Sequence, residues 1–87
     1  MLDPKPIRLS RHARDQMALR GARDDEVTDT IRTGSQSPAK RGRLGFRKDF
    51  PFGGVWAGKT YATKQVLAIV VDEPTELVVV TVYTFYF

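Results

Sequence analysis

The chain has 87 residues, a formal net charge of +4 and no cysteine. A chain of this length forms one domain with a modest core, so residues 1–87 are expected to fold as a single unit. Without cysteine, disulfides, thiolate zinc sites and cysteine nucleophiles are excluded. The single histidine and the scattered acidic residues do not suggest a metal site, and we expect neither a metal nor another cofactor.

The first third of the chain carries two helical patterns. Ala13 and Met17 recur four residues apart, a good N-cap serine precedes them, and Gly21 is a natural C-terminal stop. This pattern predicts a helix over 10–20. A second helix is predicted over 24–33, where three acidic residues suit the positive end of the helix dipole. The two helices are expected to form a hairpin joined by a tight turn.

From residue 43 onward the apolar pattern changes to the two-residue period of β-strands. Glycine, proline and acidic residues between the apolar runs indicate connections around 51–54 and 72–76. Strands are therefore predicted in four segments: 43–50, 55–62, 65–71 and 77–87. Together the elements predict an α+β fold, in which a two-helix hairpin packs on a four-stranded, mostly antiparallel sheet in the order ααββββ.

The last two predicted strands are apolar on both of their faces. One face is expected to pack on the helices, and the other requires a groove, a partner or further chain. The N-terminus has no apolar segment typical of a secretory signal. The apolar run from Val66 to Val71 is too short to span a bilayer. We therefore expect no membrane partner and a cytoplasmic location.

Charge is unevenly distributed along the chain. Residues 33–64 carry seven basic and one acidic side chain, whereas residues 65–87 carry three acidic and no basic ones. A surface polarised in this way favours a polyanion on one face, although such charge can also serve solubility alone. The polar loop before the first predicted strand contains Lys40, Arg41 and Arg43, which suit sequence-independent contact with phosphates.

The only histidine, His12, lies among arginines in the first predicted helix. At about 100° per residue, His12 and Arg20 border the buried stripe of that helix, while Arg14 projects more freely. Arginine binds phosphate through its planar fork, and histidine, with an ordinary pKa of about 6.5, suits proton transfer near neutral pH. The alternative is a solvated helix whose histidine only packs beside the core and whose arginine snorkels at its edge.

Polar and cationic side chains also alternate along the predicted strands. Arg43 and Arg47 are expected to share one face of the first strand, and Lys59 and Tyr61 one face of the second. If these strands pair suitably, the four side chains line one groove, where Tyr61 is able to stack on a base or donate a proton. The alternative is an ordinary solvated face of the sheet.

The first predicted helix and the segments after it resemble a small family of uncharacterised domains, whose pattern is His-Ala-x-x-Arg-Met-x-x-Arg-Gly-Ile before an acidic helix and a β-meander. The chain matches this pattern at His12-Ala13, Met17 and Arg20-Gly21, then at Asp24-Asp25-Glu26-Val27, and finally in the valine-rich last strand with Thr81 and Tyr83. It departs from the pattern at Gln16, where an arginine is expected, and at Ala22, where an isoleucine is expected. That family is similar to the RelE-type toxins of bacterial toxin–antitoxin pairs, and to the wider barnase-like and colicin-like ribonucleases.

The resemblance implies a RelE-like fold and a metal-independent endoribonuclease toxin that an antitoxin protein holds inactive. We expect the catalytic residues to be His12, Arg20 and Tyr61, and the RNA-binding residues to be Arg14, Arg41, Arg43, Arg47 and Lys59. The apolar sheet and the C-terminal Phe85-Tyr86-Phe87 are candidate antitoxin contacts. Because Gln16 removes a charge next to His12, a non-catalytic module that binds nucleic acid or protein on the same fold stays an alternative.

Overall fold

Two helices form close to the bounds predicted from the sequence. The computed structural model, which describes residues 4–87, has helix α1 over Arg11–Arg20 and helix α2 over Asp24–Thr33. Each helix turns a narrow, largely apolar side toward the sheet; the buried apolar residues are Ala13 and Met17 from α1, and Val27 and Ile31 from α2. The helical part of the predicted fold and its N-terminal position are confirmed.

The caps of α1 explain where that helix begins and ends. The Ser10 hydroxyl accepts a hydrogen bond from the Ala13 N–H at 3.1 Å, as an N-cap side chain does. Gly21 follows the helix with φ +75°, in the left-handed region that favours glycine. A Cβ atom at this position would lie 2.7 Å from the ring of Trp56. The tight turn between the helices therefore requires glycine.

The sheet has five strands rather than the four predicted. In spatial order they are β1 (Ile7–Leu9), β5 (Leu77–Tyr86), β4 (Lys59–Asp72), β3 (Leu44–Trp56) and β2 (Ser35–Pro38). β1 runs parallel to β5, and the other three pairs are antiparallel. The prediction of a mostly antiparallel sheet is confirmed, whereas the count of four strands and the order ααββββ are wrong.

The two unpredicted strands lie at the edges of the sheet and carry little apolar signal. β2 is a four-residue strand of serine, glutamine and proline, and all four residues are exposed. β1 has only three residues. A strand of this length or polarity gives no two-residue apolar period, so the sequence pattern cannot mark it.

The turn predicted at 51–54 lies inside β3, where the register with β4 shifts by one residue at a β-bulge. The chain reverses instead at Ala57 and Gly58, whose φ angles are +51° and +82°. Two consecutive positive φ angles are typical of a two-residue hairpin turn. The predicted strands 55–62 and 65–71 are therefore replaced by the end of β3 and one long strand, β4.

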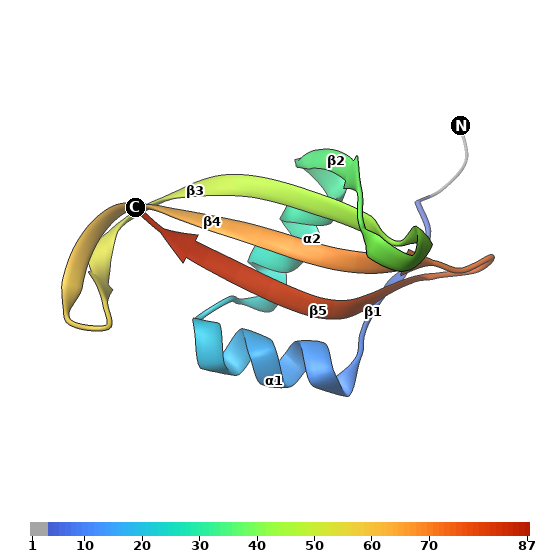
Figure 1. Ribbon diagram of the computed structural model, residues 1–87, viewed down its shortest axis with the longest axis horizontal. Coiled ribbons are helices and arrows are strands. Elements are labelled where there is room, and N and C mark those ends of the chain that lie inside the picture. The colour runs from blue at the N-terminus through green and yellow to red at the C-terminus, as the bar shows by residue number, and fades with distance from the viewer. Residues whose placement is uncertain (1–3) are drawn as a thin grey trace.

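Both helices cover the same face of the sheet (Figure 1). α1 lies along β5, and α2 packs on β3 and β4. Alternate residues of β4 are fully buried beneath the helices: Val66, Ala68 and Val70. Leu67 and Ile69, between them, point to the opposite face, which neither helix covers. We call this second face the open face.

The far end of the β3–β4 hairpin curls toward the helices (Figure 1). Phe52, Trp56 and Tyr61 pack around the ring of Tyr86, with ring centres 5.1, 4.8 and 5.9 Å from it. Trp56 is also the nearest neighbour of the turn at Gly21. This aromatic cluster fastens the hairpin to the end of α1, away from the open face.

One ion pair is buried between the sheet and α2. Nζ of Lys64 on β4 lies 2.7 Å from Oε1 of Glu26, and it also donates a hydrogen bond to the carbonyl oxygen of Gly21. Glu26 in turn accepts a hydrogen bond from the Arg23 N–H at 3.0 Å, which closes the first turn of α2. Because each charge has its partners, the pair is tolerated in the core.

Candidate nucleic-acid interface

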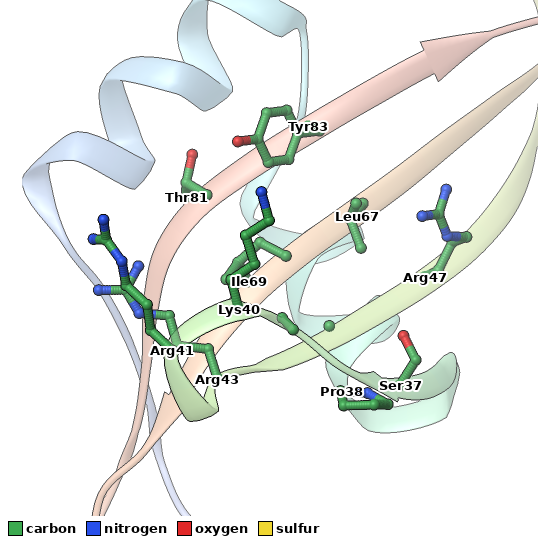
Figure 2. A pocket seen from close by; sticks show the side chains of 12 residues that line it. Ser37, Pro38, Lys40, Arg41, Arg43, Arg47, Leu67, Ile69, Thr81 and Tyr83 are labelled. Carbon is green, nitrogen blue, oxygen red and sulfur yellow. The ribbon is translucent and has the colours of Figure 1, made fainter.

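A groove of about 490 Å³ crosses the open face of the sheet (Figure 2). A volume of this size is within the usual range for ligand sites. Residues of three neighbouring strands form its floor, namely Gly45 of β3, Leu67 and Ile69 of β4, and Thr81 and Tyr83 of β5. Its wall is the segment 37–43, which joins β2 to β3 through the 3₁₀ helix η1 (Lys40–Gly42).

The wall is a tight loop that presents three cations. The Ala39 N–H donates to the Arg43 carbonyl at 2.8 Å, and the Arg43 N–H donates to the Lys40 carbonyl at 3.3 Å. Arg41 adopts a left-handed φ of +63°, which is uncommon for a residue other than glycine. Backbone strain of this kind concentrates at functional sites. The loop therefore holds Lys40, Arg41 and Arg43 at the groove in one defined backbone conformation.

A β-bulge in β5 turns Thr81 and Tyr83 to the groove. Val79 and Thr81 pair with adjacent residues of β4, so Val80 is one extra residue in β5. Val79 is buried beneath the helices. If side chains alternated strictly after Val79, residues 81 and 83 would point to the same buried face as Val79. The extra residue shifts the alternation by one, so Thr81 and Tyr83 point to the open face instead.

The cations of the groove have no acidic partners. Within residues 4–87, Lys40, Arg41 and Arg43 form no ion pair, and no carboxylate lines the groove. Arg47, at the other end of the groove, donates to the side chain of Gln65 and lies over the ring of Phe85. Four positive charges therefore surround one cavity, which gives it a positive potential.

Arg20 approaches the groove from the last turn of α1. Its Nη1 donates to the Val82 carbonyl at 2.7 Å, and its guanidinium carbon lies 4.7 Å from the centre of the Tyr83 ring. Its own carbonyl oxygen accepts hydrogen bonds from the Thr84 and Tyr86 hydroxyls at 2.9 and 2.8 Å. Burial raises the pKa of the Tyr86 hydroxyl. Arg20 thus contacts a residue of the groove floor without itself lining the groove.

His12 lies outside the groove lining and is exposed in the first turn of α1. With Gln16 and Arg20 it recurs at four-residue intervals, so the three side chains share one stripe of the helix. That stripe follows the outer edge of β5, where the Ser10 hydroxyl reaches the Val80 carbonyl at 3.4 Å and Arg20 contacts Tyr83. His12 is therefore at the exposed end of a stripe that borders the groove.

The structure does not bring Lys59 and Tyr61 together with Arg43 and Arg47. Arg43 and Arg47 line the groove. Lys59 is exposed beside the hairpin turn, and Tyr61 packs near the ring of Tyr86. The reason is that both residues lie in the first part of β4, close to the hairpin turn, and this part of the hairpin curls toward the helices before the strand reaches the groove (Figure 1).

Arg14 is on the opposite flank of α1, toward α2. Its Nη1 lies 3.9 Å from a carboxylate oxygen of Asp24, and both side chains are exposed. The structure therefore separates Arg14 from the groove, while it brings together Arg41, Arg43 and Arg47 from the predicted RNA-binding set.

The predicted set of site residues omitted Lys40 and Tyr83. Lys40 belongs to the same basic run as Arg41, so the run itself was a sufficient signal. Tyr83 belongs to the last strand of the resemblance, but the sequence does not show which face of the sheet it takes, because its direction depends on the bulge at Val80.

The match to a known family covers residues 9–84, and the family is described as a domain of unknown function, DUF4258. Because the match spans most of the chain, the protein belongs to this family. No curated protein and no solved structure matches the chain. The expectation of an uncharacterised domain family is confirmed, whereas the likeness to RelE-type toxins stays a prediction.

No helix within residues 4–87 is long and apolar enough to cross a membrane. In the same range, no three histidine, aspartate or glutamate side chains gather as they would around a metal ion.

Proposed function

We propose that the protein is a metal-independent endoribonuclease that binds the phosphate backbone of RNA in the groove of the open face. The observation that carries the proposal is the gathering of four cations, and no carboxylate of residues 4–87, around one cavity (Figure 2). Lysine and arginine contacts to phosphates supply most of the affinity of proteins for nucleic acid. Arginine also binds a phosphate through two parallel hydrogen bonds, which suits three of the four groove cations.

The proposed reaction is attack of a ribose 2′-hydroxyl on the adjacent phosphorus. His12 takes the proton of the 2′-hydroxyl as the O2′–P bond forms. The P–O5′ bond breaks, and the leaving 5′-oxygen takes a proton from solvent, to which the imidazolium later returns its own. The products are a 2′,3′-cyclic phosphate and a 5′-hydroxyl. The groove cations bind the phosphates next to the scissile one and so hold the strand at His12.

Two observations support His12 in this role. It shares a helix stripe with Arg20, which contacts Tyr83 in the groove floor. It is also exposed, so an RNA strand that leaves the groove over the outer edge of β5 is able to meet it. The resemblance of the His12 segment to ribonuclease toxins favours the same activity.

The cleavage test uses purified protein and an end-labelled single-stranded RNA in EDTA, with wild type beside His12→Ala. We expect fragments that end in a cyclic phosphate, no cleavage where the scissile nucleotide is 2′-deoxy, and a loss of about 10²- to 10⁴-fold in rate for His12→Ala. Arg11→Ala is the matched control, because Arg11 is the exposed neighbour of His12. Undiminished cleavage by His12→Ala would remove His12 from the mechanism. Absence of cleavage on both free and ribosome-bound RNA would overturn the enzymatic proposal.

The proposed partner is an antitoxin protein that holds the enzyme inactive. Large apolar side chains stay exposed at the end of β5, among them Phe85 and Phe87, and such a patch is suited to a protein contact. A small acidic protein encoded beside this one is expected to co-purify with it and suppress cleavage. Phe85→Ser is expected to weaken that complex; an unchanged complex would place the contact elsewhere.

A non-catalytic RNA-binding module is the second candidate function. It is favoured by the lining of the groove, to which the described part of the chain contributes no histidine and no carboxylate, and by Gln16 next to His12 on the helix stripe. This function predicts salt-dependent RNA binding without cleavage and an affinity that His12→Ala leaves unchanged.

A further inference from the structure

We propose that Tyr83 is a stacking platform for one unpaired nucleobase, and that Arg20 is the residue that holds this platform in position. The inference rests on the proposed function, because it takes RNA as the occupant of the groove. It adds the form of the substrate, a single strand with one base turned onto the sheet, and it gives Arg20 a role other than phosphate binding.

The two sides of the groove match the two chemical halves of a nucleotide. Tyr83 is the one aromatic side chain that lines the groove within residues 4–87, and its exposed fraction is 40%. Leu67 and Ile69 continue the apolar floor beside it, while Lys40 extends from the wall (Figure 2). Bases stack on aromatic rings regardless of sequence, and phosphates bind cations, so one nucleotide is able to satisfy both surfaces.

Arg20 covers one face of the Tyr83 ring. The distance of 4.7 Å from its guanidinium carbon to the ring centre is within the range of a cation–π contact. This arrangement leaves the other face of the ring for a ligand in the groove. The guanidinium also draws electron density toward its own side of the ring, which suits a stacked base on the opposite side.

Several hydrogen bonds fix Arg20 before any ligand arrives. Its Nη1 is bonded to the Val82 carbonyl at 2.7 Å, and its carbonyl oxygen is held by the hydroxyls of Thr84 and Tyr86. A ring that is already ordered loses less conformational entropy when a base stacks on it. Because the guanidinium is engaged by Val82 and Tyr83, we infer that Arg20 is a positioning residue.

The platform distinguishes a single strand from a duplex. In an A-form helix the bases are stacked inside, and the major groove is too deep and narrow for side chains to reach them. Only an unpaired base is able to leave its neighbours and lie flat on Tyr83. The substrate class that fits this groove is therefore single-stranded RNA, bound through at least one splayed base.

The test compares two short ligands of equal length and charge. One is a 2′-O-methyl oligonucleotide, which cannot be cut by 2′-hydroxyl attack, and the other is an abasic oligomer with the same sugar–phosphate spacing. Wild type is expected to bind the oligonucleotide about 5- to 100-fold more tightly than the abasic oligomer. Tyr83→Leu should remove this preference and leave the affinity for the abasic oligomer unchanged, while Tyr83→Trp should retain the preference.

Arg20→Met separates positioning from phosphate binding. It is expected to reduce the preference for the base-containing ligand by several-fold and to leave the salt dependence of binding unchanged. Arg43→Gln, the matched control, should weaken both ligands equally and reduce the salt dependence. Thermal unfolding checks that each variant folds, and Arg20→Gln, which removes the charge but keeps a donor for the Val82 carbonyl, replaces Arg20→Met if that variant does not.

Each outcome bears on one proposal. Equal binding of the two ligands by wild type would overturn the stacking platform and leave RNA binding by the groove intact. Failure of wild type to bind either ligand would overturn the proposed function itself. A reduced salt dependence in Arg20→Met would show that Arg20 contacts a phosphate, which would overturn its role as a positioning residue.

Discussion

The β1 end of the molecule and the wall of the groove use their cations in opposite ways. At the β1 end, Lys5 lies 2.6 Å from Asp72, and Arg8 makes two hydrogen bonds of 3.0 Å to the carboxylate of Glu76. In the described part of the groove wall, the three cations of segment 37–43 have no carboxylate partner. Net charge alone therefore does not identify a binding surface; what matters is which cations the fold leaves without partners.

The topology of the sheet explains this separation. Residues 65–87 carry three acidic side chains and no basic ones. The parallel pairing of β1 with β5 brings Arg8 of β1, and Lys5 just before it, to two of those carboxylates. The single acidic residue of the basic middle segment, Asp49, accepts a hydrogen bond from Gln65 and lies outside the groove lining. The acidic groups are thus held away from the groove.

The largest effect on stability is expected at Lys64, the cation that is buried in an ion pair with Glu26. Lys64→Met leaves the carboxylate of Glu26 buried without its partner, which should destabilise the fold by about 3–5 kcal/mol. Urea unfolding measures the change. The double variant Lys64→Met/Glu26→Gln should recover a large part of the loss. A loss of less than about 1 kcal/mol in the single variant would show that water reaches the pair.

Arg41 and Arg43 of the groove wall are expected to matter less for stability than Lys64 does, but to have a large effect on RNA binding. The double variant Arg41→Asn/Arg43→Gln should weaken RNA binding about 10- to 100-fold at low salt and reduce the salt slope by about 1.4. Asparagine is chosen because it tolerates the left-handed backbone of Arg41. The free energy of unfolding should stay within about 0.5 kcal/mol of wild type.

The control for the groove variant is Lys59→Gln, which removes an exposed cation at the hairpin turn. It should change RNA affinity only slightly. If Lys59→Gln weakens binding as much as the groove variant does, RNA binds to the overall charge of the protein, and the contrast between the two groups of cations has no functional meaning.

The smallest effect is expected at the half-buried pair of Asp29 and Lys48, which joins α2 to β3. The hydrogen bond from Lys48, supported by one from Thr33, holds the pKa of Asp29 below its ordinary range. A carboxyl whose pKa is lowered by folding stabilises the fold above its unfolded pKa of about 3.9, and this contribution is lost as the pH falls through the lower folded pKa.

Asp29→Asn should therefore lessen the fall in stability below about pH 4 and leave RNA binding unchanged. Unfolding curves between neutral and acidic pH measure the effect. Near neutrality Asp29 is ionised in both the folded and the unfolded state, so variant and wild type should show the same slope of stability against pH there. A difference in slope that appears only near neutrality would contradict this assignment.

The sequence pattern predicted those parts of the fold that depend on local periodicity. α1 and α2 follow from apolar residues at helical spacing and from the caps at Ser10 and Gly21. The polar edge strand β2 and the hairpin turn at Ala57 have no comparable signal, because neither apolar alternation nor a typical turn sequence marks them. These features depend on pairing with distant parts of the chain.

The candidate site was predicted in the same uneven way. Arg41 and Arg43 belong to a local basic loop, and that loop forms the groove wall. The aromatic residue of the site is Tyr83 rather than Tyr61, because the register of the long strands decides which tyrosine reaches the open face. The catalytic role of His12 stays a prediction.

The bulge at Val80 gives this part of β5 one residue more than a regular strand needs. Deletion of Val80 would place Val79 next to Thr81 in regular alternation, so Thr81 and Tyr83 would stay on the open face and Val82 would stay buried. We therefore expect Val80 to tolerate removal as well as substitution. Among related chains, a length difference of one residue is expected at 79–81 as well as in the loop 73–76.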